Sequence, residues 1–490
     1  MRKLFFRLQI ILITIILSSS VSAQNYSGDL EYRKWRVTLF PPLSTNGINA
    51  VDYTAKYSIN LIGGYHGGLD GAEIGGIFNY EKHYAYGFQL AGITNITGGD
   101  MAGVNIAGAL NFAKGDMSGI QLAGLVNYSE ESLEGIQATA GINFSMRSTS
   151  GLQFAGIGNA GTSSLEGLQV AGVFNATTDD ISGLQAAGIF NIARDNVEGL
   201  QAAGFLNFAG DDISGLQAAG AANIAFGEIE GLLASGFLNY AKEDASGLLV
   251  TGGVNIAPSI EGATFAGIGN IAKDIQGLQF GGFNLAEKAQ GLQIGIINIA
   301  REFQGVPVGV LSLYGNGRYN FDVKYSDAGF TDIGFTTGTH RVYNTAIIGY
   351  NTSLDRDVYR VGVAVGLEKN IEDSFENVRS NTLFVNQEIS VLHHFESDWS
   401  RTLNRVYSYK YLVGNRFGNG LSIYGGPSFN MQISRVNSSN DYTWYSLWSP
   451  TRKGRQYRFW AGFTVGLRLF KQKNLPLLED EFDESWDWDW

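Results

Sequence analysis

The chain contains no cysteine among its 490 residues. A disulfide framework, a thiolate metal site and a lipid-modified cysteine at a mature N-terminus are therefore excluded. Whatever this chain folds into must be held together by side-chain packing and hydrogen bonds alone.

Proline and charged residues are also scarce, with 7 prolines and a charged fraction of 16%. The formal net charge is -12, and this sign argues against nucleic acid as a partner. Glycine is abundant instead, with 65 residues. So much glycine with so little proline indicates ordered, close backbone packing rather than a disordered linker.

Long hydrophobic runs are absent apart from one near the N-terminus. Three basic residues among the first seven precede an apolar stretch over residues 8–17, and a small-x-small cleavage site, Val21-Ser22-Ala23, follows. This arrangement predicts a signal peptide over residues 1–23 and an exported protein. No other stretch approaches the ~20 apolar residues of a membrane helix, so any membrane insertion must use β-strands.

The glycines recur at a fixed spacing, which is 16 residues over twelve units and then shortens to 15 and 14. The pattern predicts sixteen tandem units over residues 71–317, preceded by N-terminal capping strands within residues 24–70. The first glycines of the units are Gly71, Gly87, Gly103, Gly119, Gly135, Gly151, Gly167, Gly183, Gly199, Gly215, Gly231, Gly247, Gly262, Gly277, Gly291 and Gly305.

Each unit alternates apolar and polar residues and ends in a polar turn, as in GLQAAGIFNIA over residues 183–193. This pattern is typical of short strands. The constant unit length favours a parallel β-solenoid, because stacked coils cannot absorb insertions, and it predicts ladders of Gln and Asn. The position before the first Gly alternates between Ser and Glu from Ser118 to Ser246. An antiparallel β-meander or large barrel would also produce that 32-residue period, so it stays open as an alternative.

A second β-domain is expected over residues 318–470, where the period disappears and eight strands with alternating side chains can be counted. The even number of strands suits a small antiparallel barrel of the outer-membrane type. A soluble β-sandwich or a cap on the repeats is the alternative. Residues 471–490 form an acidic Trp-rich tail, expected to be solvated and disordered, or else a recognition tag. The expected strands are 318–325, 332–337, 342–350, 359–367, 382–395, 403–413, 421–433 and 459–470.

The search for chemistry predicts no catalytic, cofactor-binding or metal-binding residue and no cofactor, and we expect the protein not to be an enzyme. The GxGxxG string at 156–161 consists of repeat columns and lacks a βαβ context. The five histidines show no metal-ligand spacing, and the Asp-rich turns lack the pattern of calcium-binding repeats. The histidines are His66, His83, His340, His393 and His394, and the turns contain Asp116, Asp179, Asp180, Asp211, Asp212 and Asp244.

The GLQxxGxxN units, above all GLQIGIINIA over residues 291–300, resemble those of the bacterial GLQ-type surface-repeat family of the cell envelope. The resemblance covers about 250 residues; it implies a cell-surface or outer-membrane location and transfers no catalytic residue.

The expected function is a structural or binding scaffold at the outer membrane or surface of a Gram-negative-type bacterium, with a face of Gln, Asn and Asp for adhesion. Outer-membrane lipid is the expected partner, with envelope proteins or glycans as further ones and no nucleic acid. The alternative is an outer-membrane barrel with a pore or scaffold role formed by the repeats and the C-terminal strands. The oligomeric state stays open.

Overall fold

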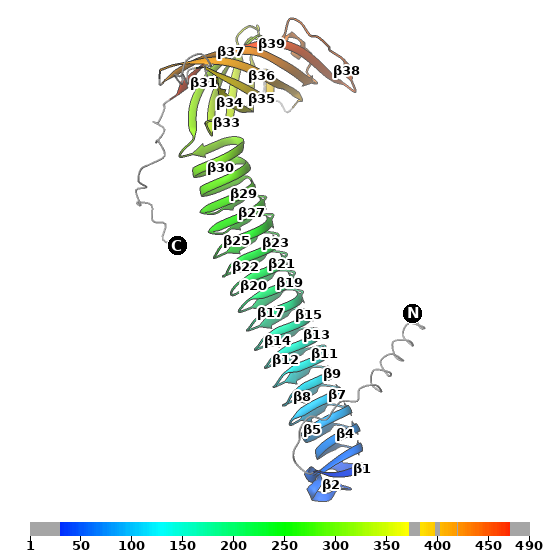
Figure 1. Ribbon diagram of the computed structural model, residues 1–490. Helices are drawn as coiled ribbons and strands as arrows, with labels where there is room; N and C mark the ends of the chain where they lie inside the picture. Colours follow the sequence, from blue (N-terminus) through cyan, green and yellow to red (C-terminus); the bar gives the residue numbers. More distant parts are fainter. Residues whose placement is uncertain (1–29, 372–382, 397–401, 419, 471–490) are drawn as a thin grey trace. The chain divides into compact units, whose positions relative to one another are not determined.

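The computed structural model describes residues 30–371, 383–396, 402–418 and 420–470. The fold is all-β and contains a β-solenoid of about 15 turns and a closed eight-stranded antiparallel β-barrel (Figure 1). The chain divides into two compact units, with the boundary between Gly267 and Ile268. The expected signal peptide (1–23) and acidic tail (471–490) lie outside the described residues.

The first unit begins with wide coils whose strands pair in parallel. β1 pairs with β3, β3 with β4, and β4 with β5, while β2 folds back antiparallel on the end of β1. N-terminal strands were expected within residues 24–70, and β1 to β3 lie there. The elements are β1 (Glu31–Phe40), β2 (Leu43–Ser44), the 3-10 helix η1 (Gly47–Asp52), β3 (Tyr53–Asn60), β4 (Gly63–Gly75) and β5 (Phe78–Ala91).

Each following coil contains one long and one short strand, joined by a glycine corner and a polar turn. The long strands are β7 (Asp100–Ala107), β9 (Met117–Ala123), β11 (Leu133–Thr139), β13 (Thr149–Ala155), β15 (Leu165–Ala171), β17 (Ile181–Ala187), β19 (Val197–Ala203), β21 (Ile213–Ala219), β23 (Ile229–Ser235), β25 (Ala245–Thr251) and β27 (Ser259–Ala266). The short strands are β6 (Thr94–Thr97), β8 (Leu110–Ala113), β10 (Val126–Ser129), β12 (Ile142–Ser145), β14 (Gly158–Gly161), β16 (Phe174–Thr177), β18 (Phe190–Ala193), β20 (Leu206–Ala209), β22 (Ala222–Ala225), β24 (Leu238–Ala241) and β26 (Val254–Ile256).

Identical positions of successive coils pair in parallel, as Gln185 does with Gln201 and as β18 does with β20. The solenoid prediction is therefore confirmed, and the meander alternative is wrong because a meander pairs neighbours antiparallel. The Ser and Glu alternation fits this stack, since Glu198 pairs with Ser182 on one side and Ser214 on the other. The 32-residue period separates like charges and does not mark a hairpin.

Two glycine columns allow the coils to stack at this distance. Gly199 has a φ of 122°, a backbone conformation that favours glycine. A Cβ there would lie 2.1 Å from the carbonyl oxygen of Gly183 in the preceding coil. In the second column, a Cβ on Gly204 would lie 2.1 Å from the oxygen of Gly188. The 16-residue glycine period thus follows from close approach of neighbouring backbones.

The second unit starts with further coils, in which β28 and β29 each pair in parallel with the long β30. Eight antiparallel strands follow, and β31 pairs with β39 to close the barrel. All eight expected strands are confirmed, and the sandwich alternative is wrong because the sheet closes on itself. The elements are β28 (Gly269–Ile271), β29 (Asp274–Phe280), β30 (Phe283–Tyr314), β31 (Arg318–Ser326), β32 (Phe330–Gly338), β33 (Val342–Asn351), β34 (Val358–Asn370), β35 (Leu383–Glu396), β36 (Asn404–Phe417), β37 (Leu421–Ser434), η2 (Asn437–Tyr442), the short β38 (Thr451–Arg452) and β39 (Arg455–Phe470).

A search of the described residues for helices long and apolar enough to cross a lipid bilayer found none.

Candidate functional surfaces

The Asn column forms a hydrogen-bonded ladder inside the solenoid. Asn191 is fully buried, and its Nδ2 donates to Asn207 Oδ1 at 2.9 Å and to the carbonyl oxygen of Ala202 at 2.8 Å. Its Oδ1 accepts from Asn175 Nδ2 at 2.9 Å. Each Asn side chain is therefore hydrogen-bonded to the Asn of both neighbouring coils and to a strand carbonyl oxygen, as buried polar groups require. We call this column the Asn ladder.

The Gln column forms a second ladder, which donates in the opposite direction along the solenoid. Gln201 Nε2 donates to Gln185 Oε1 at 2.9 Å, and Gln185 Nε2 donates to Gln169 Oε1 at 2.8 Å. This Gln ladder is interrupted where Leu233 stands in the column, and Gln217 Oε1 has no partner in front of that buried leucine. The ladder prediction is confirmed for both columns.

The expected Gln, Asn and Asp face is wrong in its amide part, because these two columns point into the solenoid. The exposed fraction of Gln185, Gln201 and Asn191 is 0%. The physical reason is that identical amides stacked at the strand spacing pair with each other and remove their own desolvation cost. The interior therefore holds the two amide columns beside two buried apolar columns, those of Ile181 and Val197 and of Ala193 and Ala209, while the remaining apolar columns of the same strands face outward.

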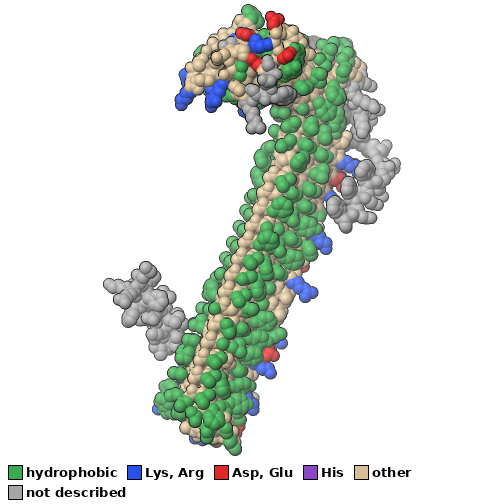
Figure 2. All heavy atoms as spheres, turned by 180° about the vertical axis from the view of Figure 1, so that it is seen from behind, with side chains coloured by type: hydrophobic (Ala, Val, Ile, Leu, Met, Phe, Trp, Pro, Cys, Tyr) green, Lys and Arg blue, Asp and Glu red, His purple; other side chains and the backbone are tan. Residues whose placement is uncertain are grey.

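The outward columns make three sides of each coil apolar. One long-strand face contains the columns of Leu200 and Ala202, and one short-strand face contains the column of Phe208. The corner between them is the most exposed, with Phe205 at 60% and Phe237 at 63%. Figure 2 shows rows of apolar side chains along the solenoid, with charged side chains gathered along one edge. We call this the apolar surface of the solenoid.

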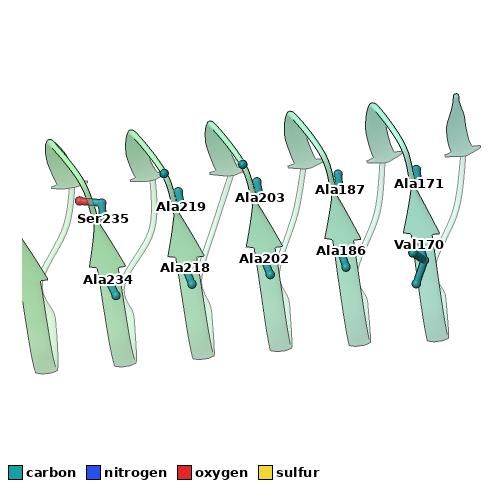
Figure 3. A pocket seen from close by; sticks show the side chains of 12 residues that line it. Val170, Ala171, Ala186, Ala187, Ala202, Ala203, Ala218, Ala219, Ala234 and Ser235 are labelled. Atoms are coloured by element: carbon teal, nitrogen blue, oxygen red, sulfur yellow. The ribbon is translucent and has the colours of Figure 1, made fainter. Parts of the chain in front are cut away.

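A shallow groove runs along the apolar surface over successive coils. Its floor consists of two neighbouring rows of small side chains, which Figure 3 shows as parallel lines of alanines. The rows contain Ala186 and Ala187 in one coil and Ala202 and Ala203 in the next. A second groove lined by Ala138, among others, continues it toward the N-terminus. Small apolar side chains without a polar partner suit an aliphatic occupant.

The polar edge consists of the turns and the Ser or Glu column. Its aspartates connect neighbouring turns: Asp180 Oδ1 accepts from the backbone N–H of Asn196 at 3.2 Å, and Asp212 Oδ1 accepts from that of Glu228 at 2.7 Å. Asp116 does the same for Ser132. The aspartates thus stabilise the stacking of the turns.

A buried charge cluster lies at the N-terminal end of the Asn ladder and also binds Gln89, which Asn105 separates from the rest of the Gln ladder. Arg36 Nη2 lies 3.0 Å from Glu73 Oε1 and 2.5 Å from Glu81 Oε1, and the exposed fraction of all three side chains is 0%. Gln89 Nε2 donates to Glu73 Oε2 at 2.9 Å, and Asn60 Nδ2 donates to Glu73 Oε1 at 2.7 Å. The Glu73 carboxylate therefore accepts from Asn60, which in turn donates to the Asn ladder at Asn79, and from Gln89.

Burial and neighbouring charges shift the pKa values of this cluster. Burial and the Arg36 guanidinium lower the pKa of His66 to about 3, so the imidazole is neutral at pH 7. Although burial acts to raise the pKa of Glu73, the same guanidinium lowers it below its usual range. Burial and the Glu73 carboxylate raise the pKa of Glu81 well above its usual range. Arg36, Glu73 and Glu81 together make a buried structural plug.

The barrel lumen is filled by ion pairs. Lys324 Nζ lies 2.6 Å from Glu388 Oε2, and Lys410 Nζ lies 2.9 Å from Glu388 Oε1. The other ion pairs of low exposure are Arg360 with Asp332, Arg468 with Asp322, and Glu368 with Arg318, Arg416 and Arg468. Between the described side chains, the lumen cavity lined by Asp327, Arg360 and Trp460 measures about 20 Å³, which is room for about one water.

The outer face of the barrel is apolar on every long strand. The most exposed of these side chains are Ile389 at 63%, Phe429 at 59% and Phe321 at 57%. Their strand neighbours Glu388 and Asn430 point into the lumen and are buried.

The histidines and the GxGxxG string do not come together in one site. His66 lies in the N-terminal cluster, while His394 is buried in the barrel and its neighbour His393 points to the opposite side. The string at 156–161 runs from the corner of one coil through β14. Across the described residues, no group of three or more His, Asp or Glu side chains could hold a metal ion.

Comparison with protein-family models found no matching family, and searches of curated proteins and of solved structures found no match either.

Proposed function

We propose that the protein is a non-catalytic outer-membrane scaffold, in which the C-terminal barrel is inserted in the lipid bilayer and the solenoid is the scaffold that it anchors. The observation that carries the proposal is the distribution of side chains in the barrel, apolar outside and charged inside. Lipid-facing barrels have this arrangement, with strands of about 9–11 residues or more that alternate between lipid and lumen. The barrel strands β31 to β37 contain 9 to 14 residues, and β39 contains 16.

Closure of the barrel supports the same proposal. Strand edges exposed to hydrocarbon carry unpaired backbone groups at a cost of several kcal/mol each, and pairing of β31 with β39 removes them. The expected signal peptide adds a route of export. The resemblance to the GLQ-type surface-repeat family agrees with an envelope location.

A pore is less well supported than an anchor. The Lys324–Glu388–Lys410 ion pairs occupy the lumen, and the cavity beside them has room for about one water. The repeats contribute no barrel strand, since they form parallel coils. We therefore expect purified protein to give no steady ion conductance in planar bilayers.

The test of membrane insertion uses the full chain refolded into phosphatidylcholine vesicles. We expect it to float with the vesicles and to migrate differently in gel electrophoresis before and after boiling. Ile389→Lys places a charge on the outer face in the middle of β35, where it costs about 2–4 kcal/mol in a bilayer, so the folded, floating fraction should fall.

The matched control is Asp355→Lys, which adds a lysine to an exposed loop between β33 and β34. It should insert like the parent chain. Parent protein that stays in the soluble fraction, or Ile389→Lys that inserts as well as Asp355→Lys, would contradict the proposed anchor.

A further inference from the structure

We infer that the apolar surface of the solenoid is a lipid-binding surface: the first unit lies along a bilayer with three sides among acyl chains and the polar edge in water. This inference rests on the proposed membrane anchorage and extends it to a part of the chain outside the barrel. Four features of the solenoid lead to it.

The first feature is that backbone groups of the apolar sides are hydrogen-bonded from coil to coil. Each strand pairs with the preceding and the following coil. The corners are satisfied as well: the N–H groups of Gly188, Ile189 and Phe190 all donate to carbonyl oxygens of the coil before. Hydrocarbon accepts a protein surface only under this condition, because unpaired backbone groups there cost several kcal/mol each.

The second feature is the extent of the apolar surface. Twelve coils at 16-residue spacing make a stack about 58 Å long, and a seven-residue strand spans about 23 Å, so one face covers on the order of 1000 Å². Monomeric soluble proteins rarely expose contiguous apolar patches above a few hundred Å². An uncovered surface of this size is unfavourable in water, so it needs an occupant.

The third feature selects lipid as that occupant. The apolar columns continue around the corner of Phe205 and Phe237, so that both faces and the corner must be covered. A second copy docked on one face leaves the other face and the corner in water. Protein interfaces also carry a polar rim, whereas here the polar groups gather along one edge. Fluid acyl chains cover all three sides at once.

The fourth feature is the amphipathic arrangement along the solenoid. The turns and the Ser or Glu column, among them Glu198, Asp211 and Ser214, are exposed and follow one edge. An element with one polar and one apolar side lies in the plane of a membrane interface. The alanine groove of Figure 3, lined by Ala186, Ala187, Ala202 and Ala203 among others, offers acyl chains a shallow seat.

The test uses single-cysteine variants of the full chain, which has no cysteine of its own. Phe205→Cys and Phe237→Cys place a nitroxide label at the corner, while Glu198→Cys and Ser214→Cys place it on the polar edge. In phosphatidylethanolamine and phosphatidylglycerol vesicles, collisions with oxygen and with a water-soluble nickel chelate are compared at each label. We expect the oxygen-to-nickel ratio to be several-fold higher at the corner than at the edge.

Equal ratios at corner and edge would overturn the inference. Corner labels shielded from both reagents, with spin–spin broadening that grows with protein density, would also overturn it and would identify a second copy as the occupant. Flotation of the same samples separates the two proposals. If the protein floats with the vesicles but its corner labels are exposed to water, the barrel is inserted in the bilayer and the solenoid does not contact lipid. The boiling-sensitive gel migration and strand-rich circular dichroism check that each variant has folded.

Discussion

At the scale of single residues, the glycine columns allow the backbones of neighbouring coils to approach closely. Gly167 has a φ of 136°, and a Cβ on it would lie 2.2 Å from the carbonyl oxygen of Gly151. Gly161, only six residues earlier, has no such restriction, because the nearest atoms to an added Cβ are 3.8 Å away. Its column holds Ala193 and Ala209 in later coils. The close approach of the preceding coil therefore requires a glycine at position 167, whereas no such contact requires one at position 161.

Gly167→Ala should destabilise the solenoid by at least about 2 kcal/mol, because the strained backbone costs about 1–3 kcal/mol before the clash is counted. Gly161→Ala should be neutral or stabilise by about 0.4–1 kcal/mol through the unfolded chain. Hydrogen exchange of residues 149–187 in the full chain measures both. Equal protection in the two variants would show that coil contact does not set the glycine period.

At the scale of elements, the Gln ladder allows a test of what its hydrogen bonds contribute. Gln185→Leu breaks the middle of the ladder and leaves Gln169 Oε1 and Gln201 Nε2 without these partners. Each buried unpaired group costs about 1–3 kcal/mol, so a loss of about 3 kcal/mol is expected.

Gln217→Leu is the matched control at the interruption. It frees Gln201 Oε1 but removes Gln217 Oε1, which already lacks a partner, so the number of unpaired atoms stays the same. Denaturant titration of the full chain, followed by hydrogen exchange around residues 185 and 217, should show little loss of stability for Gln217→Leu. If Gln217→Leu costs as much as Gln185→Leu, side-chain packing and not the ladder stabilises this column.

The strands and their register are the part of the fold that the sequence predicts best. The 16-residue period fixed the coil and its register, and alternation located all eight barrel strands, because both signals depend on local spacing alone. Local alternation does not predict which side of a strand faces inward. The pattern of Leu184, Gln185 and Ala186 fits either orientation, and the usual expectation is that the apolar residues are buried. The inward side of the long strand holds both the aliphatic column of Ile181 and the Gln column, since Gln and Asn recur at the same place in nearly every unit and can satisfy one another only when stacked inside.

At the scale of the whole molecule, both units bury hydrogen-bonded polar columns or ion pairs and present apolar side chains outward. In the solenoid the inner polar groups are amides, which lie beside buried aliphatic columns such as that of Ile181 and Val197, and the Arg36 cluster lies at one end. In the barrel they are ion pairs such as Lys324 with Glu388. The two units reach this arrangement through parallel and antiparallel pairing, and neither leaves unpaired strand edges along its sides. A bilayer is the environment that we propose for these surfaces.

The most direct test of this account is a lipid footprint of the full chain in vesicles that contain a photoactivatable phospholipid, with crosslinked residues mapped by mass spectrometry. The account predicts crosslinks at outward positions of both units, such as Ile389 and Phe429 in the barrel and Phe205 in the solenoid. Their inward neighbours, Glu388 and Gln201, should remain unlabelled. A footprint confined to the polar edge, or equal labelling of inward and outward positions, would contradict it.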